Sequence, residues 1–503
     1  MVDAPTESVR PLSRRVGQML RAQIDELGPG AVRDQLIAEC ARLDRPLRVA
    51  VAGQVSAGKS TMVNALLARR VAPTGAAETT RLFALYEFDE NEGVDIELAD
   101  GRVLRRSLRA DGSMPTELGV PPQAVDLLRV RLSSSAMVSA VTLVDTPGLD
   151  SVRETASALT ERRIFGGEGS TTVDADALIF LLQAGGRNRE TEWLSAFREL
   201  TGSSLASCSI NTVGVLSKID QDNDPEPLRQ FGRIAQRLAR EPALRLQLAT
   251  VVPVAGLLAE TVRAGLLTED HFASLQALAT SLGARYATAS VPLFYKAISE
   301  LGGHELLAEE LISRLGLFGV DRTLAGLQSG VETLGELYRV LLRESGFEAI
   351  SAVISQAFMP RTDVLKADQA LAATTRLSYQ LPEMAGARMR SVAEELVLEP
   401  SMHQLRELHA VRACIGDDAV ELPANLQEEL RTLTGSGTAA QRLGLPANAT
   451  ADDIRSAARR KAMEAIAVGA DPTVGPGERR VIDVMRMSYA ALWQQADDQL
   501  AAT

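Results

Sequence analysis

Aromatic residues, cysteine and histidine are all scarce in this chain of 503 residues, and each shortage excludes a class of protein. The three cysteines, Cys40, Cys208 and Cys414, lie far apart and form no CxxC pair, so we expect neither a disulfide framework nor a zinc site. With four histidines and no HExxH motif, a histidine-based metal or catalytic centre is not expected. This cysteine usage is typical of the reducing cytosol.

Long apolar runs and an excess of positive charge are also missing. No stretch approaches the roughly 18–20 consecutive apolar residues of a transmembrane helix, and the charged N-terminus lacks a signal-peptide core. Any membrane contact should therefore be peripheral. The formal net charge is −12, with 53 basic against 65 acidic residues. Because nucleic-acid binding needs a basic surface, we expect no nucleic-acid partner.

The order of the apolar segments predicts an α/β domain followed by helices. Short β-branched runs alternate with helical stretches after Pro46, which indicates a mainly parallel sheet covered on both faces. The expected strands are Leu47–Ala52, Ser139–Val144, Ala177–Leu182, Val213–Leu216 and Thr250–Val254. From residue 258 onward, apolar residues recur at helical spacing. We therefore expect an α/β domain joined to a large α-helical bundle region.

Breaks in this pattern divide the chain into four parts. Residues 1–45 should form helices, interrupted at Gly28–Gly30, that join the helical bundle. Residues 46–257 should form the α/β domain, and residues 258–434 the helical bundle region. A glycine-containing linker then precedes residues 435–503, which should form a C-terminal helical hairpin unit.

A complete phosphate-binding motif follows the first expected strand. Gly53–Ser60 reads GQVSAGKS and matches GxxxxGK[ST], and a helix is expected over Thr61–Arg69 directly after it. Its glycines let backbone N–H groups converge on the β-phosphate, and the helix N-terminus adds positive potential. Lys59 would neutralise the β- and γ-phosphate oxygens, while the Ser60 hydroxyl would bind Mg²⁺. Only five lysines occur against 48 arginines, so a lysine at this position is a strong signal.

A second motif, DTPG at Asp145–Gly148, ends an apolar strand. Asp145 would reach Mg²⁺ through water, and the Gly148 N–H would sense the γ-phosphate, so that the following loop becomes a switch. An ATPase of the AAA or RecA type more often carries four apolar residues and an Asp-Glu pair here. The motif therefore favours a GTPase. Because 86 residues separate Lys59 from Asp145, more than a minimal domain needs, we expect extra structure inserted between them.

A third motif, SKID at Ser217–Asp220, matches the Lys and Asp of [NT]KxD after an apolar strand. Asp220 would accept hydrogen bonds from the N1–H and exocyclic N2–H of guanine, and Lys218 would pack its stem along the base. Adenine presents a lone pair at N1, so the same carboxylate selects against ATP. Ser217 departs from the usual Asn or Thr but keeps a hydroxyl.

The first switch segment should lie at Pro73–Arg81, before the second strand. A threonine there would complete the Mg²⁺ shell. We choose Thr80 because it directly precedes Arg81, with Thr79 as the alternative. Leu149 stands where small GTPases carry a glutamine that orients water, so hydrolysis needs another way of positioning the water.

Taken together, these motifs make the N-terminal half resemble bacterial dynamin-like GTPases. The likeness extends to the helical segments Arg314–Val320, Phe358–Ala367 and Gly435–Pro446, which are similar to those of the actinobacterial, isoniazid-inducible branch of that family. The resemblance implies a dynamin-type G domain, with GTP as substrate and Mg²⁺ as cofactor. It also implies that GTP drives association of two G domains and that the helical bundles act on membrane.

The resemblance carries site roles over to individual residues. It assigns nucleotide contacts to Gly53, Gln54, Val55, Ser56, Ala57, Gly58, Lys59, Ser60, Thr61, Asp145, Gly148, Lys218 and Asp220. It assigns catalytic roles to Ser56, Lys59 and Thr80, and metal binding to Ser60, Thr80 and Asp145. Ser56 matches the residue that helps place a monovalent cation, K⁺ or Na⁺, and Arg81 could be an analogue of a switch arginine. Val55 replaces the glutamine that organises the catalytic water in eukaryotic dynamins.

The expected partners also follow from the resemblance. They are a second G domain of the same chain, a second dynamin-like protein, and lipid at the inner, cytoplasmic face of the cell membrane. Val291–Tyr295 and Leu315–Val320 are the candidate lipid-contacting segments, although for either segment alone ordinary helix packing is the favoured interpretation. The alternative function is a soluble GTP-dependent switch that acts on a protein partner without binding lipid.

Overall fold

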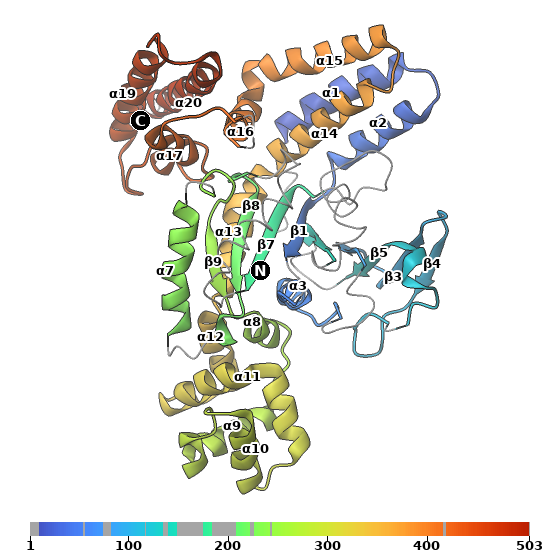
Figure 1. Cartoon of the computed structure of the whole chain (residues 1–503), viewed down its shortest axis with the longest axis vertical. Coiled ribbons are helices and arrows are strands. Elements are labelled where there is room, and N and C mark those ends of the chain that lie inside the picture. The colour runs from blue at the N-terminus through green and yellow to red at the C-terminus, as the bar shows by residue number, and fades with distance from the viewer. Residues whose placement is uncertain are drawn as a thin grey trace.

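The computed structural model describes most of the chain. The described residues are 10–53, 56–73, 82–115, 117–133, 139–147, 175–183, 208–221, 226–241, 244–415 and 419–501. Figure 1 shows a sheet at the centre, with helical units above and below it. The described part contains no helix of the length and apolarity needed to cross a membrane.

Nine described strands form one mixed sheet, in the order β4-β3-β5-β2-β6-β1-β7-β8-β9. Their bounds are β1 Leu47–Gly53, β2 Ala84–Phe88, β3 Gly93–Leu98, β4 Val103–Arg106, β5 Val125–Leu132, β6 Val141–Asp145, β7 Ala177–Gln183, β8 Thr212–Ser217 and β9 Val251–Val254. The run β6-β1-β7-β8-β9 is parallel throughout, as the continuous apolar strands predict. The α/β fold class is therefore confirmed.

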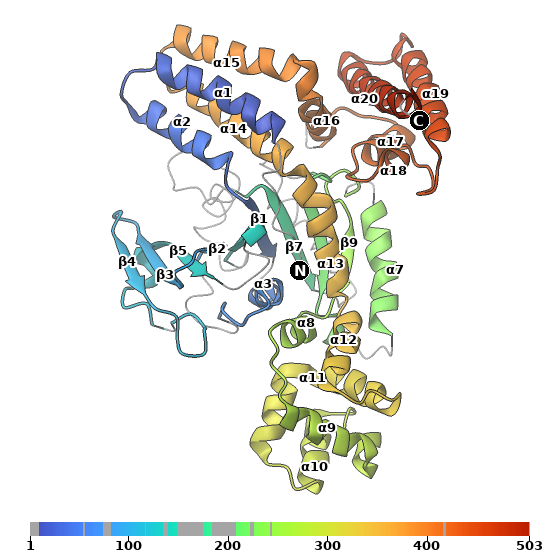
Figure 2. The ribbon, with the colours of Figure 1, turned by 180° about the vertical axis from the view of Figure 1, so that it is seen from behind.

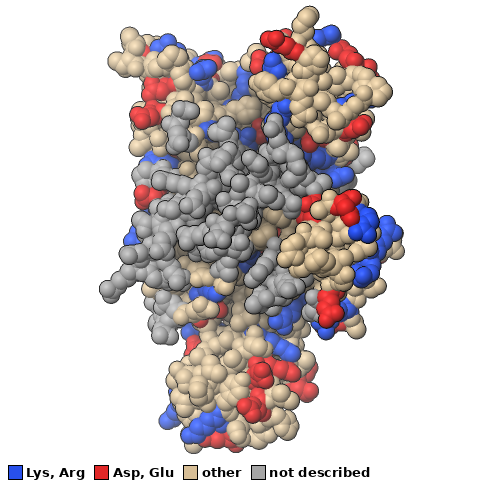
Figure 3. All heavy atoms as spheres, turned by 45° about the vertical axis from the view of Figure 1, so that its right-hand side comes forward, with Lys and Arg blue, Asp and Glu red and all other residues tan. Residues whose placement is uncertain are grey.

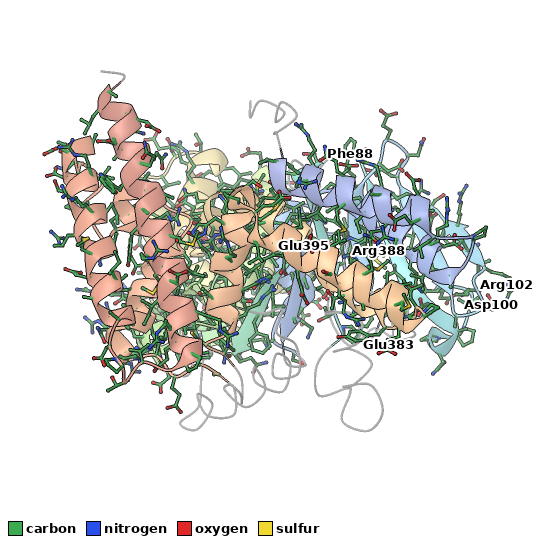
Figure 4. The ribbon with its side chains drawn as sticks, turned by 90° about the horizontal axis from the view of Figure 1, so that it is seen from above. Phe88, Asp100, Arg102, Glu383, Arg388 and Glu395 are labelled. Carbon is green, nitrogen blue, oxygen red and sulfur yellow. The ribbon has the colours of Figure 1, made fainter. Side chains whose placement is uncertain are left out.

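The insertion expected between Lys59 and Asp145 consists of the strands β2 to β5. β2 pairs antiparallel with β6 and parallel with β5, and β3 and β4 extend this edge as an antiparallel hairpin. Asp100 and Arg102 lie side by side at the tip of that hairpin, where Arg102 Nε donates to Asp100 Oδ2 over 2.8 Å (Figure 4). The insertion thus widens the sheet instead of forming a separate unit.

Helices make up the rest of the described chain, and no described residue after Val254 belongs to a strand. The first helices are α1 Pro11–Glu26, α2 Ala31–Arg42, α3 Lys59–Leu67, α7 Pro227–Arg240 and α8 Gly256–Arg263. A lower unit follows, with α9 Glu269–Thr280, α10 Val291–Glu300, α11 Glu305–Gln328 and α12 Leu334–Glu344. α13 Phe347–Val353 lies beside the sheet, and the upper units hold α14 Thr362–Ser378, α15 Glu383–Leu398, α16 His403–Arg412, α17 Ala424–Leu433, α18 Ala439–Arg442, α19 Ala451–Gly469 and α20 Pro476–Ala501.

The N-terminal helices α1 and α2 lie beside α14 and α15, more than 300 residues away in sequence (Figure 2). Asp363 explains how α1 is held, because its carboxylate accepts hydrogen bonds from the backbone N–H groups of Leu12 (2.9 Å) and Ser13 (2.8 Å). These N–H groups have no partner within the helix, and a carboxylate also suits the positive end of the helix dipole. Arg388 of α15, labelled in Figure 4, pairs with Glu26 at the other end of α1 over 3.0 Å.

A buried ion pair joins this upper bundle to the sheet. Lys366 of α14 lies 2.7 Å from Asp176, directly before β7, and both side chains are almost completely buried. Asp176 also accepts the backbone N–H of Arg48 in β1 over 2.7 Å. The neighbouring Gln369 Nε2 donates to the carbonyl of Ala175 over 2.5 Å. α14 is therefore attached to the sheet at the point where two parallel strands begin.

The two apolar segments considered for lipid contact pack mainly into the lower unit. Phe294, Leu315 and Val320 are buried in its core. Gly316 adopts φ +61° and interrupts the helical geometry of α11. Leu315–Val320 is therefore helix-packing sequence, which confirms the second of the two interpretations left open by its periodicity. In Val291–Tyr295, Val291 at the start of α10 remains exposed.

Candidate functional site

The phosphate-binding motif lies where β1 meets α3, at the carboxyl ends of the parallel strands. Gly53 is the last residue of β1 and adopts φ +152°. A Cβ at this position would lie 2.6 Å from the carbonyl oxygen of Leu181 in β7, so the sheet leaves no room for a side chain. Gly58, with φ +90°, then turns the chain into α3. The expected strand–loop–helix context is present, although α3 begins at Lys59 and not at Thr61.

Lys59 is folded back over the loop. It is nearly buried, and its Nζ donates to the carbonyl oxygen of Gly53 over 3.2 Å. Ser56 adopts φ +63°, which is uncommon for a residue with a side chain. Ala57 is fully buried. This geometry places an ammonium group inside the turn of the loop, where a phosphate would need a compensating charge.

Ser60 and Asp145 meet across adjacent elements. Ser60 Oγ in the first turn of α3 donates to Asp145 Oδ2 at the end of β6 over 2.9 Å. The parallel register pairs Asp145 with Val51 of β1, and Thr146 Oγ1 donates to the carbonyl of Val51 over 3.0 Å. Burial raises the pKa of Asp145 to about 6, while Lys59 and the Ser60 hydroxyl act in the opposite direction. Ser60 and Asp145, the two expected Mg²⁺ ligands among the described residues, are thus neighbours.

This pair has the chemistry that Mg²⁺ requires. Mg²⁺ prefers oxygen ligands and usually keeps several waters, bound through one or two carboxylates and substrate phosphates. Asp145 Oδ1 is buried, and none of the described residues donates a hydrogen bond to it. A cation or its bound water would satisfy that oxygen, so Ser60 and Asp145 fit the cofactor expected from the sequence.

The SKID motif follows β8 and supports a base site. Ser217 is buried at the strand end, and Lys218 adopts φ +57°. The turn is closed by the backbone N–H of Gln221, which donates to the carbonyl of Lys218 over 3.1 Å. Asp220 Oδ1 is buried without a hydrogen-bond donor among the described residues, and burial raises the pKa of this carboxyl. An acceptor held in this state suits a ligand with two adjacent N–H donors, as guanine has.

The structure brings together only part of the predicted site. Gly53, Ser56, Ala57, Gly58, Lys59, Ser60, Thr61, Asp145, Lys218 and Asp220 lie at the carboxyl edge of the parallel strands or in the elements that follow them. Gln54, Val55, Thr79, Thr80, Arg81, Gly148 and Leu149 fall outside the described residues. The switch roles of Thr80, Thr79 and Gly148, and the consequence of Val55, therefore stay predictions.

Sequence reasoning missed one residue beside the site. Asn64, one turn after Ser60, is fully buried and makes four hydrogen bonds, three to backbone and one to Glu260. Its signal was a polar residue inside the apolar run of Met62 to Leu67. A buried amide must find partners, and these partners lie partly on a distant segment that no local pattern reveals.

Comparisons with known proteins identify the family of this chain. The model of the Dynamin family matches residues 49–219. The isoniazid-induced protein IniC of Mycobacterium tuberculosis, from two strains, is 33% identical over 433 residues, covering 83% of this chain and 84% of IniC. Dynamin-like protein 2 of Campylobacter jejuni is 25% identical over 182 residues, covering 36% of this chain and 28% of the relative.

One solved structure is similar over nearly the full length. It is described as an oligomerised bacterial dynamin pair that provides a mechanism for long-range sensing and tethering of membranes. The alignment covers 99% of this chain and 93% of that chain, with 11% sequence identity and a TM-score of 0.34. A similarity of this size supports no inference about function.

Proposed function

Because this chain belongs to the bacterial dynamin-like GTPases, the family of IniC, we propose that it couples GTP hydrolysis to the action of its helical bundles on a membrane. The chain is a GTP hydrolase with a dynamin-type GTPase domain. We assign that domain to residues 46–257, with the remaining helices as the mechanical part. Each further step below rests on particular described residues.

The site residues divide the chemistry between charge and recognition. Lys59 neutralises the β- and γ-phosphates from inside the loop, and Ser60 and Asp145 hold Mg²⁺, which supplies charge neutralisation at the phosphates. Asp220 selects guanine through its buried, unpartnered oxygen. Ser56 contributes to placing a monovalent cation, K⁺ or Na⁺, and Thr80 completes the metal shell.

We propose that pairing of two G domains supplies the catalytic group that this chain lacks in the place of a water-orienting glutamine. Leu149 occupies the place of a water-orienting glutamine. A group supplied in trans to such a site accelerates hydrolysis roughly 10³–10⁵-fold. In our proposal this group comes from a second copy of the chain, or from a second dynamin-like protein, that associates across the nucleotide face. Turnover per molecule should then rise with protein concentration.

Exposed leucines at the end of the lower helical unit carry the membrane part of the proposal. Leu282, Leu301 and Leu306 are 80%, 42% and 71% exposed; Leu282 begins the short helical turn before α10, Leu301 directly follows α10, and Leu306 lies in the first turn of α11. In Figure 3 the lower unit shows basic and acidic patches among its uncharged residues. Each leucine would gain at most about 1.5–3 kcal/mol on full burial. These side chains replace Leu315–Val320, whose Leu315 and Val320 are buried, as the candidate lipid contact.

The charge of this end predicts how it would bind. Residues 281–310 contain two basic side chains, Arg285 and Lys296, against four acidic ones, which gives a formal charge of −2. Attraction to anionic lipid is therefore not the driving force, and binding should depend on apolar insertion at the cytoplasmic face of the membrane. The rival function, a soluble switch acting on a protein partner, predicts no vesicle binding at all.

The first experiment measures GTP turnover against protein concentration, with and without phosphatidylcholine vesicles, using Lys59→Ala as the blank. We expect cooperative turnover and co-sedimentation that resists added salt. In the double variant Leu282→Ser/Leu306→Ser, sedimentation should be lost. Met384→Ser is the matched control, because Met384 is 88% exposed on α15 of the upper bundle.

Three results would overturn parts of this proposal. Constant specific activity over a wide concentration range would rule out stimulation by pairing. Absence of wild-type sedimentation on any vesicles would leave the soluble switch. Equal sedimentation of the leucine and Met384 variants would remove the lower unit as the contact.

A further inference from the structure

Asn64 ties the phosphate-loop helix to the segment that leads into the first switch. Its Oδ1 accepts the backbone N–H groups of Val71 (2.9 Å) and Ala72 (2.7 Å). Its Nδ2 donates to the carbonyl of Ala72 (3.0 Å) and to Glu260 Oε1 (2.7 Å). An amide side chain offers two donors and two acceptor positions, so every position is used. Asn64 is completely buried, which makes each of these bonds costly to lose.

Glu260 supplies the fourth bond from a different part of the chain. It lies on α8, directly after the last strand, and is 2% exposed. Burial raises the pKa of its carboxyl, while the bond from Asn64 and the charge of Arg70, whose Nε lies 3.6 Å away, oppose this rise. A buried carboxyl is costly unless it is hydrogen-bonded or paired with a charge, and Asn64 and Arg70 supply these contacts to Glu260.

The same two helices touch at further points. Arg263 Nε of α8 donates to the carbonyl of Ala65 over 3.4 Å, and a Cβ at Gly256 would meet the methyl of Thr61 at 3.7 Å. α8 in turn leads into the lower helical unit. A displacement of α8 would therefore act on α3 and, through Asn64, on residues 71–72.

Residues 71–73 are the last described ones before the segment that contains Thr79 and Thr80. Asn64 stands four positions after Ser60, so both side chains lie on one face of α3. The helix α3 thus carries the hydroxyl expected to bind Mg²⁺ and, through Asn64, binds the backbone of residues 71 and 72. Three of the four bonds of Asn64 hold residues 71 and 72 at a set distance from this helix, and the fourth, to Glu260, orients the amide.

We propose that Asn64 and Glu260 are positioning residues for GTP hydrolysis, because they hold Val71 and Ala72, the described backbone nearest the first switch, against the helix that carries Ser60. The bonds among Asn64, Glu260, Val71 and Ala72 form what we call the Asn64 clamp. This inference rests on the proposed role of the switch threonine.

Glu260→Ala tests the clamp in the full chain. Asn64 Nδ2 keeps its bond to Ala72, so the fold should survive. We expect kcat to fall about tenfold, consistent with losing one charge-assisted bond, with KM for GTP changing less than threefold. The Mg²⁺ concentration for half-maximal turnover should rise by a similar factor. Glu260→Gln keeps an acceptor oxygen for Asn64 and should restore both values.

Thr261→Val is the matched control. Thr261 is the next residue on α8, is fully buried, and donates to the carbonyl of Arg314 in α11 over 2.5 Å. Loss of the Thr261 hydroxyl should lower Tm about as much as Glu260→Ala does, without changing kcat. The clamp is refuted if Glu260→Ala keeps wild-type kcat and Mg²⁺ dependence, if Thr261→Val slows turnover equally, or if Glu260→Gln fails to rescue.

Thr80→Ala separates this inference from the switch assignment on which it rests. An unchanged Mg²⁺ requirement in Thr80→Ala would remove Thr80 as a ligand. In contrast, an unchanged kcat in Glu260→Ala beside a strongly impaired Thr80→Ala would remove the clamp alone.

Discussion

Replacing Asp220 with asparagine should change which nucleotide the protein accepts. The carboxylate of Asp220 can accept both the N1–H and the N2–H of guanine. Asparagine keeps one acceptor oxygen but places an NH₂ donor opposite the guanine amino group. Xanthine carries a carbonyl at that position, so the asparagine amide can accept from its N1–H and donate to its O2. Asp220→Asn should therefore prefer xanthosine triphosphate.

The structure sets the size of this effect. Asp220 Oδ1 is already buried without a donor among the described residues, so the cost of removing it from water is present before the nucleotide binds. Each charge-assisted hydrogen bond then contributes about 1.5–3 kcal/mol. Asparagine loses one of these bonds and keeps the other only as a neutral bond of about 0.5–1.5 kcal/mol, so GTP binding should weaken by about 2–5 kcal/mol, which corresponds to roughly 30-fold to 5,000-fold.

Fluorescent GTP and xanthosine triphosphate analogues, titrated against wild type and Asp220→Asn, measure both affinities. Glu226→Gln is the control, because this substitution also removes one negative charge shortly after the motif. Glu226 is exposed and pairs with Arg229. Glu226→Gln should bind GTP as the wild type does. Unchanged GTP affinity in Asp220→Asn would show that Asp220 does not contact the base.

Two further substitutions test the packing of the sheet and the upper bundle. Gly53→Ala should cost about 1–3 kcal/mol, since its Cβ would lie 2.6 Å from the Leu181 carbonyl; a Tm equal to that of Gly28→Ala, where the space is open, would contradict this. Asp368 pairs with Arg412 over 2.6 Å, and its pKa is lowered to about 2 although burial opposes this. Because the folded pKa lies below 3.8, this stabilisation, about 2 kcal/mol, is present above pH 4 and is lost as pH falls through about 2. Asp368→Asn should lower Tm at pH 7, and a wild-type Tm there would refute the assignment.

The nucleotide site was predictable because its signals are local. Each motif combines an apolar strand with the polar residues that directly follow it, and parallel strands bring their carboxyl ends to one edge of the sheet. Gly53, Asp145 and Ser217 accordingly end β1, β6 and β8. The insertion was predicted only as extra length, although the apolar positions in β5 alternate in part as expected for a strand with one polar face.

Long-range partners were beyond sequence reasoning. The bond between Asn64 and Glu260 joins residues 196 positions apart, and nothing in either neighbourhood specifies the other. Periodicity also cannot distinguish an apolar helix face that meets protein from one that meets lipid. Leu315–Val320 has the composition of a lipid contact, yet Leu315 and Val320 fill the core around the bend at Gly316.

The ion pair between Lys366 and Asp176 makes the junction between the upper bundle and the sheet stiff. Because both side chains are buried, separating them would leave two charges without partners at a cost of about 3–5 kcal/mol. Changes in the angle between α14 and β7 that break the pair are therefore disfavoured. A rotation of about 10° at Lys366 would move the far end of α14, roughly 18 Å away, by about 3 Å. We therefore expect α14 to move together with the start of β7.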